Sequence, residues 1–477
     1  MKRASDNLFH GGAEMADRAA SYDSYLKQHR SEQLAELNEF LRIPSISALS
    51  EHKPDVRRAA EFLAKALHQL GFDAVEVIPT KGHPLVYGER LEGPGRPTVL
   101  VYGHYDVQPV DPLNLWETPP FEPAIRDGQL YARGASDDKG PVFMHLKAVE
   151  TLLAVDGRLP VNLKFLVEGE EEVGGEHLDE YIRTHREKLA ADAVVISDTT
   201  MYARGLPAIC TGLRGLTALQ VDVYGANTDL HSGLFGGAVE NPLNALARLV
   251  ASLHTKDGAV AVSGFYDRVR PATPAELESI ASLPFADGEY QAELGVPALA
   301  GEPGYSTLER LWVRPTLDAN GMWGGFQGEG TKTVIPSEGH VKITCRLVPD
   351  QEPAEIFSLV AAHLKRNCPP GVRIEVRQME GARPSVVSTD HPAVEAAAHA
   401  LQESYGVKPA YIRMGGSIPV VQTFQEELQA PVVLIGFGLP DEKFHAPNEH
   451  FDLGNFDLGL RTLCRYWNEL AAWQPKK

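Results

Sequence analysis

The sequence has few cysteines and no long apolar run. Its four cysteines are scattered over 477 residues without a Cys-x-x-Cys pair, so we expect neither a disulfide framework nor a structural zinc site built from cysteines. No stretch approaches the roughly 18 to 20 apolar residues of a membrane-spanning helix. The first residues, MKRASDNLFHGGAEMADRAA, lack the apolar segment of a signal peptide. These absences predict a cytoplasmic protein without a membrane partner.

Positive charge is also scarce. There are 45 lysines and arginines against 64 aspartates and glutamates, which gives a formal net charge of −19. Binding to nucleic acid requires a basic surface, so we expect no nucleic-acid partner. An acidic composition fits a protein that gathers carboxylates around cations, although most of these residues are expected on the solvated surface. The length predicts two domains, because one hydrophobic core rarely serves so long a chain.

Apolar runs alternate with helical patterns in much of the sequence. The strand-like runs are apolar throughout, as in strands that are covered on both faces of a parallel sheet. They are residues 99–103, 162–169, 193–197 and 431–438. Helical apolar spacing covers residues 22–42, 54–70, 140–154, 176–189, 391–405 and 455–471. This pattern predicts the α/β class with a doubly wound, mostly parallel sheet.

The pattern changes after residue 212. Residues 216–226 alternate apolar and polar side chains, as in a half-exposed antiparallel strand. Expected helices at 242–254 and 353–367 and expected strands at 340–349 and 372–380 complete an α+β, β-α-β-β-α-β-like set, with a loop-rich stretch before about residue 310. We therefore predict a main domain of residues 1–212 and 384–477, with 1–20 poorly ordered, and an inserted domain of residues 213–383.

Five expected strand ends carry side chains that can bind a metal ion. In open α/β sheets, ligands gather at the carboxyl ends of the strands. The side chains there are His104 with Asp106, Asp137 with Asp138, the four glutamates of EGEEE (168, 170, 171 and 172), Asp198, and His445 with Glu449 and His450. Each alone has an ordinary explanation as a core histidine, a helix N-cap or an acidic turn. Their recurrence at one edge of a sheet indicates a shared site.

Crowded carboxylates need a cation. Without one they would repel each other and hold protons, whereas a pair of divalent ions removes that problem. Mixed sets of histidines and carboxylates suit zinc, manganese or cobalt. We therefore interpret His104 as a metal ligand and Asp106 as the carboxylate that fixes its tautomer.

Nine motifs spread over the chain carry a resemblance to a known family. They are GHYDVQPV, YARGASDDKG, EGEEEVGG, ISDTTMY, TDLHSGLFGG, KTVIP, CRLVPD, GGSIP and FHAPNE. They look like the carnosine dipeptidase branch of the dinuclear zinc exopeptidases, a family that also contains aminoacylase, acetylornithine deacetylase, succinyl-diaminopimelate desuccinylase and carboxypeptidase G. The resemblance runs from about residue 30 to the C-terminus. It implies a catalytic main domain and an inserted lid and dimerisation domain.

The resemblance also implies metal ligands. It places His104 and Asp198 on one ion, Glu172 and His445 on the other, and Asp137 between the two. Zinc is the expected metal, with manganese or cobalt as alternatives. Asp138 is not an implied ligand.

The resemblance makes Glu171 the general base. Its register in EGEEE rests on Gly174, because the family places base and ligand just before the residue that precedes this glycine, and Glu170 falls where relatives carry other residues. A water between the two ions would be acidified, and Glu171 would take its proton and pass it to the leaving amine.

Further residues are implied for the substrate. His231 is the family's candidate for an oxyanion donor and would reach the active site of a second subunit, which predicts a homodimer; it could instead cap the Ser-Gly-Leu turn that follows it. Arg346 offers a fork for a substrate carboxylate, although an arginine on a surface strand is usually solvated. Gly416 and Ser417 offer backbone and hydroxyl donors, and Thr333 is a weaker candidate.

The preferred interpretation is a metal-dependent dipeptidase or related exopeptidase that acts on small peptides. Within the family, aspartate at the position of Asp198 accompanies aminopeptidase and dipeptidase activity, whereas deacylases and carboxypeptidases carry glutamate. One alternative is an N-acyl amino acid deacylase or desuccinylase on the same dinuclear site. Another is a catalytically inactive binding protein, which is disfavoured because none of the seven implied metal-site positions is missing.

Overall fold

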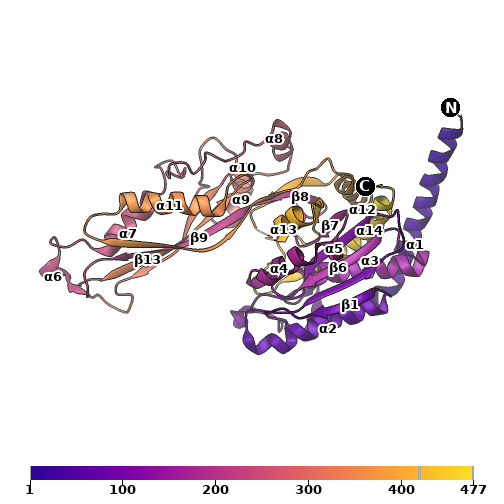
Figure 1. Ribbon diagram of the computed structural model, residues 1–477, viewed down its shortest axis with the longest axis horizontal. Coiled ribbons are helices and arrows are strands. Elements are labelled where there is room, and N and C mark those ends of the chain that lie inside the picture. Colours follow the sequence, from indigo (N-terminus) through magenta and orange to yellow (C-terminus); the bar gives the residue numbers. More distant parts are fainter. Residues whose placement is uncertain (1, 417, 419, 475–477) are drawn as a thin grey trace. The chain divides into compact units, whose positions relative to one another are not determined.

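The computed structural model describes residues 2–416, 418 and 420–474 and divides into two compact units (Figure 1). The first unit contains Met1–Thr211, Val387–Tyr411 and Val420–Lys477, and the second contains Gly212–Val386 and Ile412–Pro419. The short segment Ile412–Pro419 groups with the second unit, whereas the sequence prediction places it in the main domain. The catalytic and lid roles of the two parts remain predictions.

A large mixed sheet forms the core of the first unit. Among the described residues, its strands follow the order β1-β2-β6-β3-β7-β17-β8-β15, with β16 paired to β8. Their bounds are β1 (Asp73–Ile78), β2 (Leu85–Arg90), β6 (Asn162–Glu168), β3 (Thr98–His104), β7 (Ala193–Ile196), β17 (Val432–Ile435), β8 (Ala208–Leu213), β15 (Ser385–Val386) and β16 (Ala410–Met414). The four strands β6, β3, β7 and β17 are parallel, whereas β1, β2, β8 and β15 pair antiparallel with their neighbours. The α/β class is confirmed, and the sheet is mixed because antiparallel strands flank a parallel centre.

Helices cover this sheet. Each central strand is buried along nearly its whole length, which explains its continuous apolar sequence. The helices are α1 (Lys2–Leu41), α2 (Lys53–Gln69), α3 (Lys139–Asp156), α4 (Glu176–Thr184), α5 (Arg186–Leu189), α12 (Pro392–Tyr405), α13 (Val420–Glu427) and α14 (Leu453–Ala471). The helices α1, α3, α12 and α14 pack side by side, and α13 packs on α4. Residues 2–20, which the sequence predicts to be poorly ordered, form the beginning of α1.

The second unit is built on a four-stranded antiparallel sheet in the order β11-β13-β9-β14. Its elements follow the chain as β9 (Gly215–Tyr224), α7 (Pro242–Ala251), β11 (Thr316–Gly324), β13 (Glu338–Leu347), α11 (Pro353–Asn367) and β14 (Arg373–Ala382). Leu219, Val221 and Val223 of β9 belong to the core under α7 and α11. The alternate residues Gln220 and Asp222 lie on the other face, as the period of two requires.

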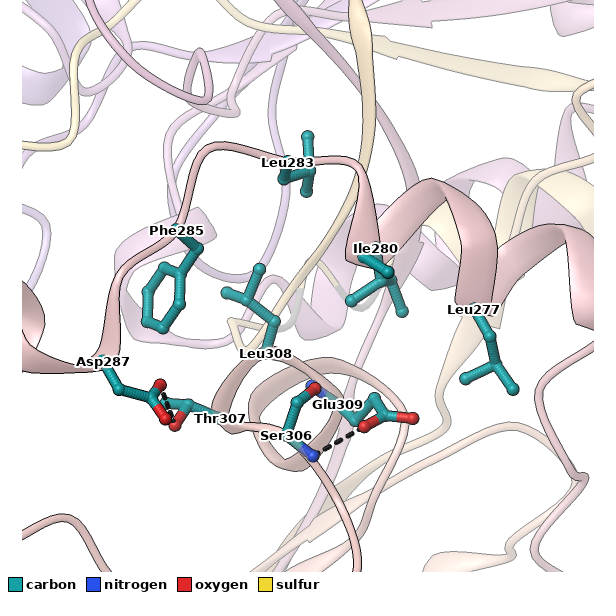
Figure 2. Close-up of a pocket in the computed structure, with 10 residues that line it drawn as sticks. Leu277, Ile280, Leu283, Phe285, Asp287, Ser306, Thr307, Leu308 and Glu309 are labelled. Atoms are coloured by element: carbon teal, nitrogen blue, oxygen red, sulfur yellow. Dashed lines mark hydrogen bonds between the residues drawn. The ribbon is translucent and has the colours of Figure 1, made fainter.

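Three short helices fill the stretch predicted as loop: α8 (Pro274–Ala281), α9 (Asp287–Leu294) and α10 (Thr307–Trp312). Capping boxes at Thr273 and Ser306 begin α8 and α10, which stabilises such short helices. A pocket of about 510 Å³ lies between them. Figure 2 shows the side chains of Leu277, Ile280, Leu283, Phe285 and Leu308 that line it. Its polar groups bond to one another: Thr307 donates to Asp287, and the Ser306 amide donates to Glu309.

Across the described residues, none of the helices combines the length and the apolar character that crossing a membrane would require.

Candidate metal centre

Predicted site residues of the first unit lie where its parallel strands end. His104 is the last residue of β3 and pairs in register with Glu168, the last residue of β6. Asp198 follows β7 by two residues. Parallel strands end at one edge of the sheet, so side chains that are far apart in sequence meet there. His104 is fully buried at this edge.

Two groups of ligand atoms form around Asp137. One oxygen of its carboxylate lies 3.0 Å from His104 Nε2, which is 3.9 Å from an oxygen of Asp198. The other oxygen lies 2.9 Å from His445 Nε2, which is 3.3 Å from an oxygen of Glu172. Within each group of three, all ligand atoms lie within 4.8 Å of one another. The structure thus brings together the two sets that the family resemblance implies, and their role as ligands remains a prediction.

Asp138 lies outside both groups. One oxygen of its carboxylate accepts the backbone N–H of His104 at 3.2 Å, at the point where α3 begins. A Cβ at Gly103 would lie 2.6 Å from this oxygen and 2.4 Å from Val142. Only glycine at 103 therefore lets β3 approach the start of α3 this closely, and this approach sets His104 beside Asp137.

The orientation of His104 is set by Asp106. The imidazole Nδ1 lies 3.1 Å from the backbone carbonyl of Asp106 and 3.5 Å from its carboxylate. Either oxygen requires a proton on Nδ1, so Nε2 is the nitrogen that can bind a metal ion, and without one Nε2 donates to Asp137. The other carboxylate oxygen of Asp106 accepts the Glu172 amide at 3.2 Å. The nearer partner of Nδ1 is thus the backbone carbonyl of Asp106, whereas the sequence predicted its carboxylate.

The glutamates of EGEEE point in different directions. Glu170 bonds to His177 Nδ1 at 2.7 Å, and its carboxylate packs against Gly82. Glu172 faces His445 and accepts from the Gln108 side chain at 2.7 Å. Glu171 begins the short helix η3 (Glu171–Val173). Only Glu172 of the three belongs to a group of candidate ligands.

The charges of the site are strongly coupled. Burial, followed by the charge of Asp137, raises the pKa of Asp198 to about 7. Burial, with added repulsion from Asp198 and Glu172, raises the pKa of Glu171 well above its usual range. Hydrogen bonds to Asp137 and Glu172 raise the pKa of His445 to about 10. The carboxylates therefore hold protons on themselves and on the imidazoles where no other cation is present.

The shifted pKa values show whether these residues fit metal ions. Burial opposes a charged imidazole at His104, yet hydrogen bonds to Asp106 and Asp137 raise its pKa well above the usual value. The pKa of Asp137 is lowered because the bonds from His104 and His445 outweigh its burial. The site thus attracts positive charge on both sides of Asp137. Two imidazoles and three carboxylates in this arrangement fit two divalent ions.

The remaining predicted residues belong to the second unit. His231 ends β10 (Leu230–His231) and its Nδ1 accepts the Gly233 amide at 3.0 Å, so it caps α6 (Ser232–Phe235). The turn-capping contact considered in the sequence analysis is therefore present, and the role of His231 as an oxyanion donor remains a prediction. An acceptor Nδ1 leaves the proton of a neutral ring on Nε2, and the residue is exposed. The carbonyl of Thr333 accepts the Ser232 amide at 3.0 Å.

Arg346 lies on β13 and has a second arginine close by. Burial and the charge of Arg346 lower the pKa of Arg214 to about 10. A Cβ at Gly415 would lie 2.7 Å from the Arg214 guanidinium, so this side chain packs against Gly415, the residue before the exposed Gly416. Ser417 lies outside the described residues. Sequence reasoning missed Arg214, whose signal is a charged residue inside the apolar junction ICTGLRGLTAL.

A mixed α/β sheet with histidines and carboxylates gathered at its carboxyl edge is typical of a metal-dependent hydrolase. Residues 100–469 match Peptidase family M20/M25/M40. The Cys-Gly metallodipeptidase dug1 of Schizosaccharomyces pombe is 32% identical over 465 residues, which are 94% of this chain and 98% of that protein. The chain therefore belongs to Peptidase family M20/M25/M40, and the predicted resemblance is confirmed.

Two solved structures are similar along nearly the whole chain. The crystal structure of human carnosine dipeptidase 1 has a TM-score of 0.82 and 32% sequence identity, covering 95% of this chain and 99% of that one. The M20 family metallo-carboxypeptidase Sso-CP2 from Sulfolobus solfataricus has a TM-score of 0.84 and 33% identity, covering 93% and 100%. These similarities confirm the fold class.

Proposed function

We propose that the protein hydrolyses dipeptides with the help of two divalent metal ions. The observation that carries this proposal is the carboxylate of Asp137, which directs one oxygen to each of two groups of candidate ligands. The names of its relatives, Cys-Gly metallodipeptidase and carnosine dipeptidase, support a dipeptide as the substrate. Zinc is the preferred metal, and manganese or cobalt would fit the same donors.

The chain's own residues would supply binding and proton transfer. Ions held by Asp137 and its neighbours would polarise the scissile carbonyl and acidify the attacking water. Glu171 lies in a buried setting that raises its pKa, which suits a group that first accepts the proton of the water and then donates it to the leaving amine. Asp106 would keep His104 in the tautomer that presents Nε2.

Recognition of the substrate would fall to the second unit. The Arg346 guanidinium would bind the free C-terminal carboxylate, with Gly416, Ser417 and Thr333 as further donors. His231 would stabilise the oxyanion in the active site of a second subunit, so we propose a homodimer. The cytoplasmic location expected from the sequence remains a prediction.

A second candidate activity is removal of the C-terminal residue from longer or N-blocked peptides. It is favoured by the similarity to the metallo-carboxypeptidase Sso-CP2. Both activities would use Arg346 to bind the C-terminal carboxylate, whereas only a dipeptidase requires a free amine next to the scissile bond. N-acyl amino acid deacylation remains the alternative on the same site.

The test combines a metal count with a substrate panel. Metal-free protein should bind two divalent ions per chain and then cleave free dipeptides faster than N-blocked dipeptides, tripeptides or N-acyl amino acids. Zinc, manganese and cobalt are added back in turn. Faster cleavage of N-blocked peptides would instead indicate a carboxypeptidase.

The variant Asp137→Ala tests the shared ligand. It should lose both ions and all measurable turnover, because each group loses one of its three ligands. Asp457→Ala on α14 removes a carboxylate that binds Arg30 and should keep both ions. One ion per chain in the native protein, or two in Asp137→Ala, would contradict the proposal.

A further inference from the structure

Glu449 is a buried carboxylate that receives four hydrogen bonds. Its Oε2 accepts from the Arg133 side chain at 2.7 Å and from the Gly134 amide at 3.0 Å. Its Oε1 accepts from the amides of Ser136 and Asp137 at 3.0 and 3.1 Å. Three of the four donors are therefore backbone groups of the segment that carries Asp137. Glu449 does not belong to either group of candidate ligands, although the sequence analysis included it among the side chains that can bind a metal ion.

Arg133 extends this contact to a second loop. It is 1% exposed, and its other terminal nitrogen donates to the carbonyl of Pro109 at 3.0 Å. Pro109 lies in the loop that leaves β3 after His104. A planar guanidinium can hold a carboxylate and a carbonyl at fixed angles, which a lysine cannot do.

The loop after β17 is the third one joined here. The carbonyl of Glu449 accepts the Ala132 amide at 3.1 Å, and the next residues form β18 (His450–Asp452), which pairs with β5 (Gln129–Tyr131). The Ser136 hydroxyl bonds to the carboxylate of Glu442. His445 lies between these two glutamates, so the loop that carries it is fastened to the Asp137 segment on both sides.

We propose that Glu449 and Arg133 are positioning residues for the metal centre. Together they join the three loops that carry His104, Asp137 and His445. This inference rests on the proposed dinuclear function. The Asp137 amide is itself a donor to Glu449, so displacing it moves a carboxylate that serves both groups of ligands. Loss of Glu449 should therefore lower the affinity of the protein for both metal ions.

The variant Glu449→Gln keeps the shape of the side chain but removes an acceptor. An amide nitrogen cannot accept, so at least two of the four donors lose their partner whichever way the amide turns. Supporting residues of this kind typically change metal affinity by about 10- to 100-fold. We expect the dissociation constants of both ions to rise by that factor, measured by competition with a chromophoric chelator. The absorption spectrum of the cobalt-loaded protein should also change.

Glu92→Gln is the matched control. Glu92 accepts from Arg90 at 2.8 Å and from the Leu159 amide at 3.2 Å, close to the amino ends of β3 and β6 and so at the opposite edge of the sheet. It tests whether loss of an arginine–carboxylate pair alone lowers metal affinity. We expect Glu92→Gln to bind metal with the affinity of the native protein, even if its melting temperature falls as much as that of Glu449→Gln.

Two further variants keep the inference open to refutation if Glu449→Gln does not fold. Glu449→Asp keeps the charge but is too short to reach both pairs of donors, and Arg133→Lys keeps the ion pair but releases Pro109. Each should weaken metal binding, Arg133→Lys less than Glu449→Asp. Native affinity in every folded member of the three would overturn the inference. If the native protein itself binds no divalent ion, the proposed function fails instead, so the two failures are distinguishable.

Discussion

The two units place their predicted functional residues in opposite surroundings. In the first unit, His104, Asp106 and Asp137 are buried, and His104 bonds to both aspartates. In the second unit, His231 and Thr333 are exposed, and Arg346 is half-buried on a strand of the sheet. One unit holds an assembled centre, and the other presents separate donors.

This difference indicates what each region needs in order to act. Buried carboxylates that raise one another's pKa values require a cation, which can be bound by one chain alone. Exposed donors acquire geometry only when a substrate or another chain is bound. We therefore expect chemistry to depend on the first unit and recognition on the second. Variants in the two units can test this division, and the largest effect is expected in the first unit.

Glu171→Gln should remove the proton acceptor of the first unit while keeping its size. Turnover should fall by about 10²- to 10⁴-fold, the usual contribution of general acid–base catalysis, with both metal ions retained. Glu170→Gln is the matched control, because Glu170 binds His177 and packs at Gly82. It should have a mild effect on the rate. A larger loss of turnover in Glu170→Gln than in Glu171→Gln would show that Glu170 is the general base.

His231 tests whether the centre of the first unit is sufficient. His231→Ala should lower turnover by about 10²- to 10³-fold, as expected for loss of an oxyanion donor. Mixing inactive His231→Ala chains with inactive Glu171→Gln chains should restore activity, because a mixed dimer has one site with neither change. No recovery after subunit exchange would place His231 in its own chain's site. A monomer by light scattering would refute the arrangement directly.

Arg346→Ala should affect recognition more than chemistry. A charge-assisted hydrogen bond contributes about 1.5–3 kcal/mol, so the Michaelis constant for dipeptides should rise by roughly 10- to 100-fold with a smaller change in kcat. An amidated dipeptide should be a poor substrate of the native protein and lose little more in the variant. Equal losses on both substrates would show that Arg346 does not bind the carboxylate.

The smallest expected effect is on the pH dependence of folding stability, and it does not involve the catalytic residues. Burial lowers the pKa of His145 from 6.5 to about 3, so unfolded chains bind its proton first. The stability that it contributes is present above pH 6.5 and is lost as the pH falls toward 3. Between pH 7 and 5 the loss is about 2 kcal/mol. Denaturant unfolding of metal-free His145→Leu should show a correspondingly flatter pH dependence, and an unchanged slope would contradict this account.

The sequence predicted the elements whose pattern is regular. The parallel strands β3, β6, β7 and β17 were predicted because burial on both faces leaves a continuous apolar run. The strand β11 was not, since TLDANGMWG combines glycine and asparagine with a mostly exposed surface. The predicted helix over 176–189 is divided at His185.

The candidate ligands could be predicted because their residue types and strand-end positions recur. The supporting residues could not. Gln108 and Arg214 are single polar side chains, and nothing in their local sequence specifies a partner that is far away in the chain. The sequence marked Glu449 as a side chain that can bind a metal ion, yet its carboxylate accepts hydrogen bonds from backbone amides instead. Its partners became visible only when the fold placed residues 133–137 around it.

The position of β17 has a consequence for the order in which the protein can be completed during synthesis. This strand lies between β7 and β8 in the sheet, but it is translated more than 200 residues after them. Until it emerges from the ribosome, β7 and β8 each have an edge without its final partner, and unpaired edges invite aggregation. The second unit can form its own sheet during this interval, since all four of its strands are translated earlier. Completion of the first unit, and of its candidate metal centre with His445, is therefore among the last events of synthesis.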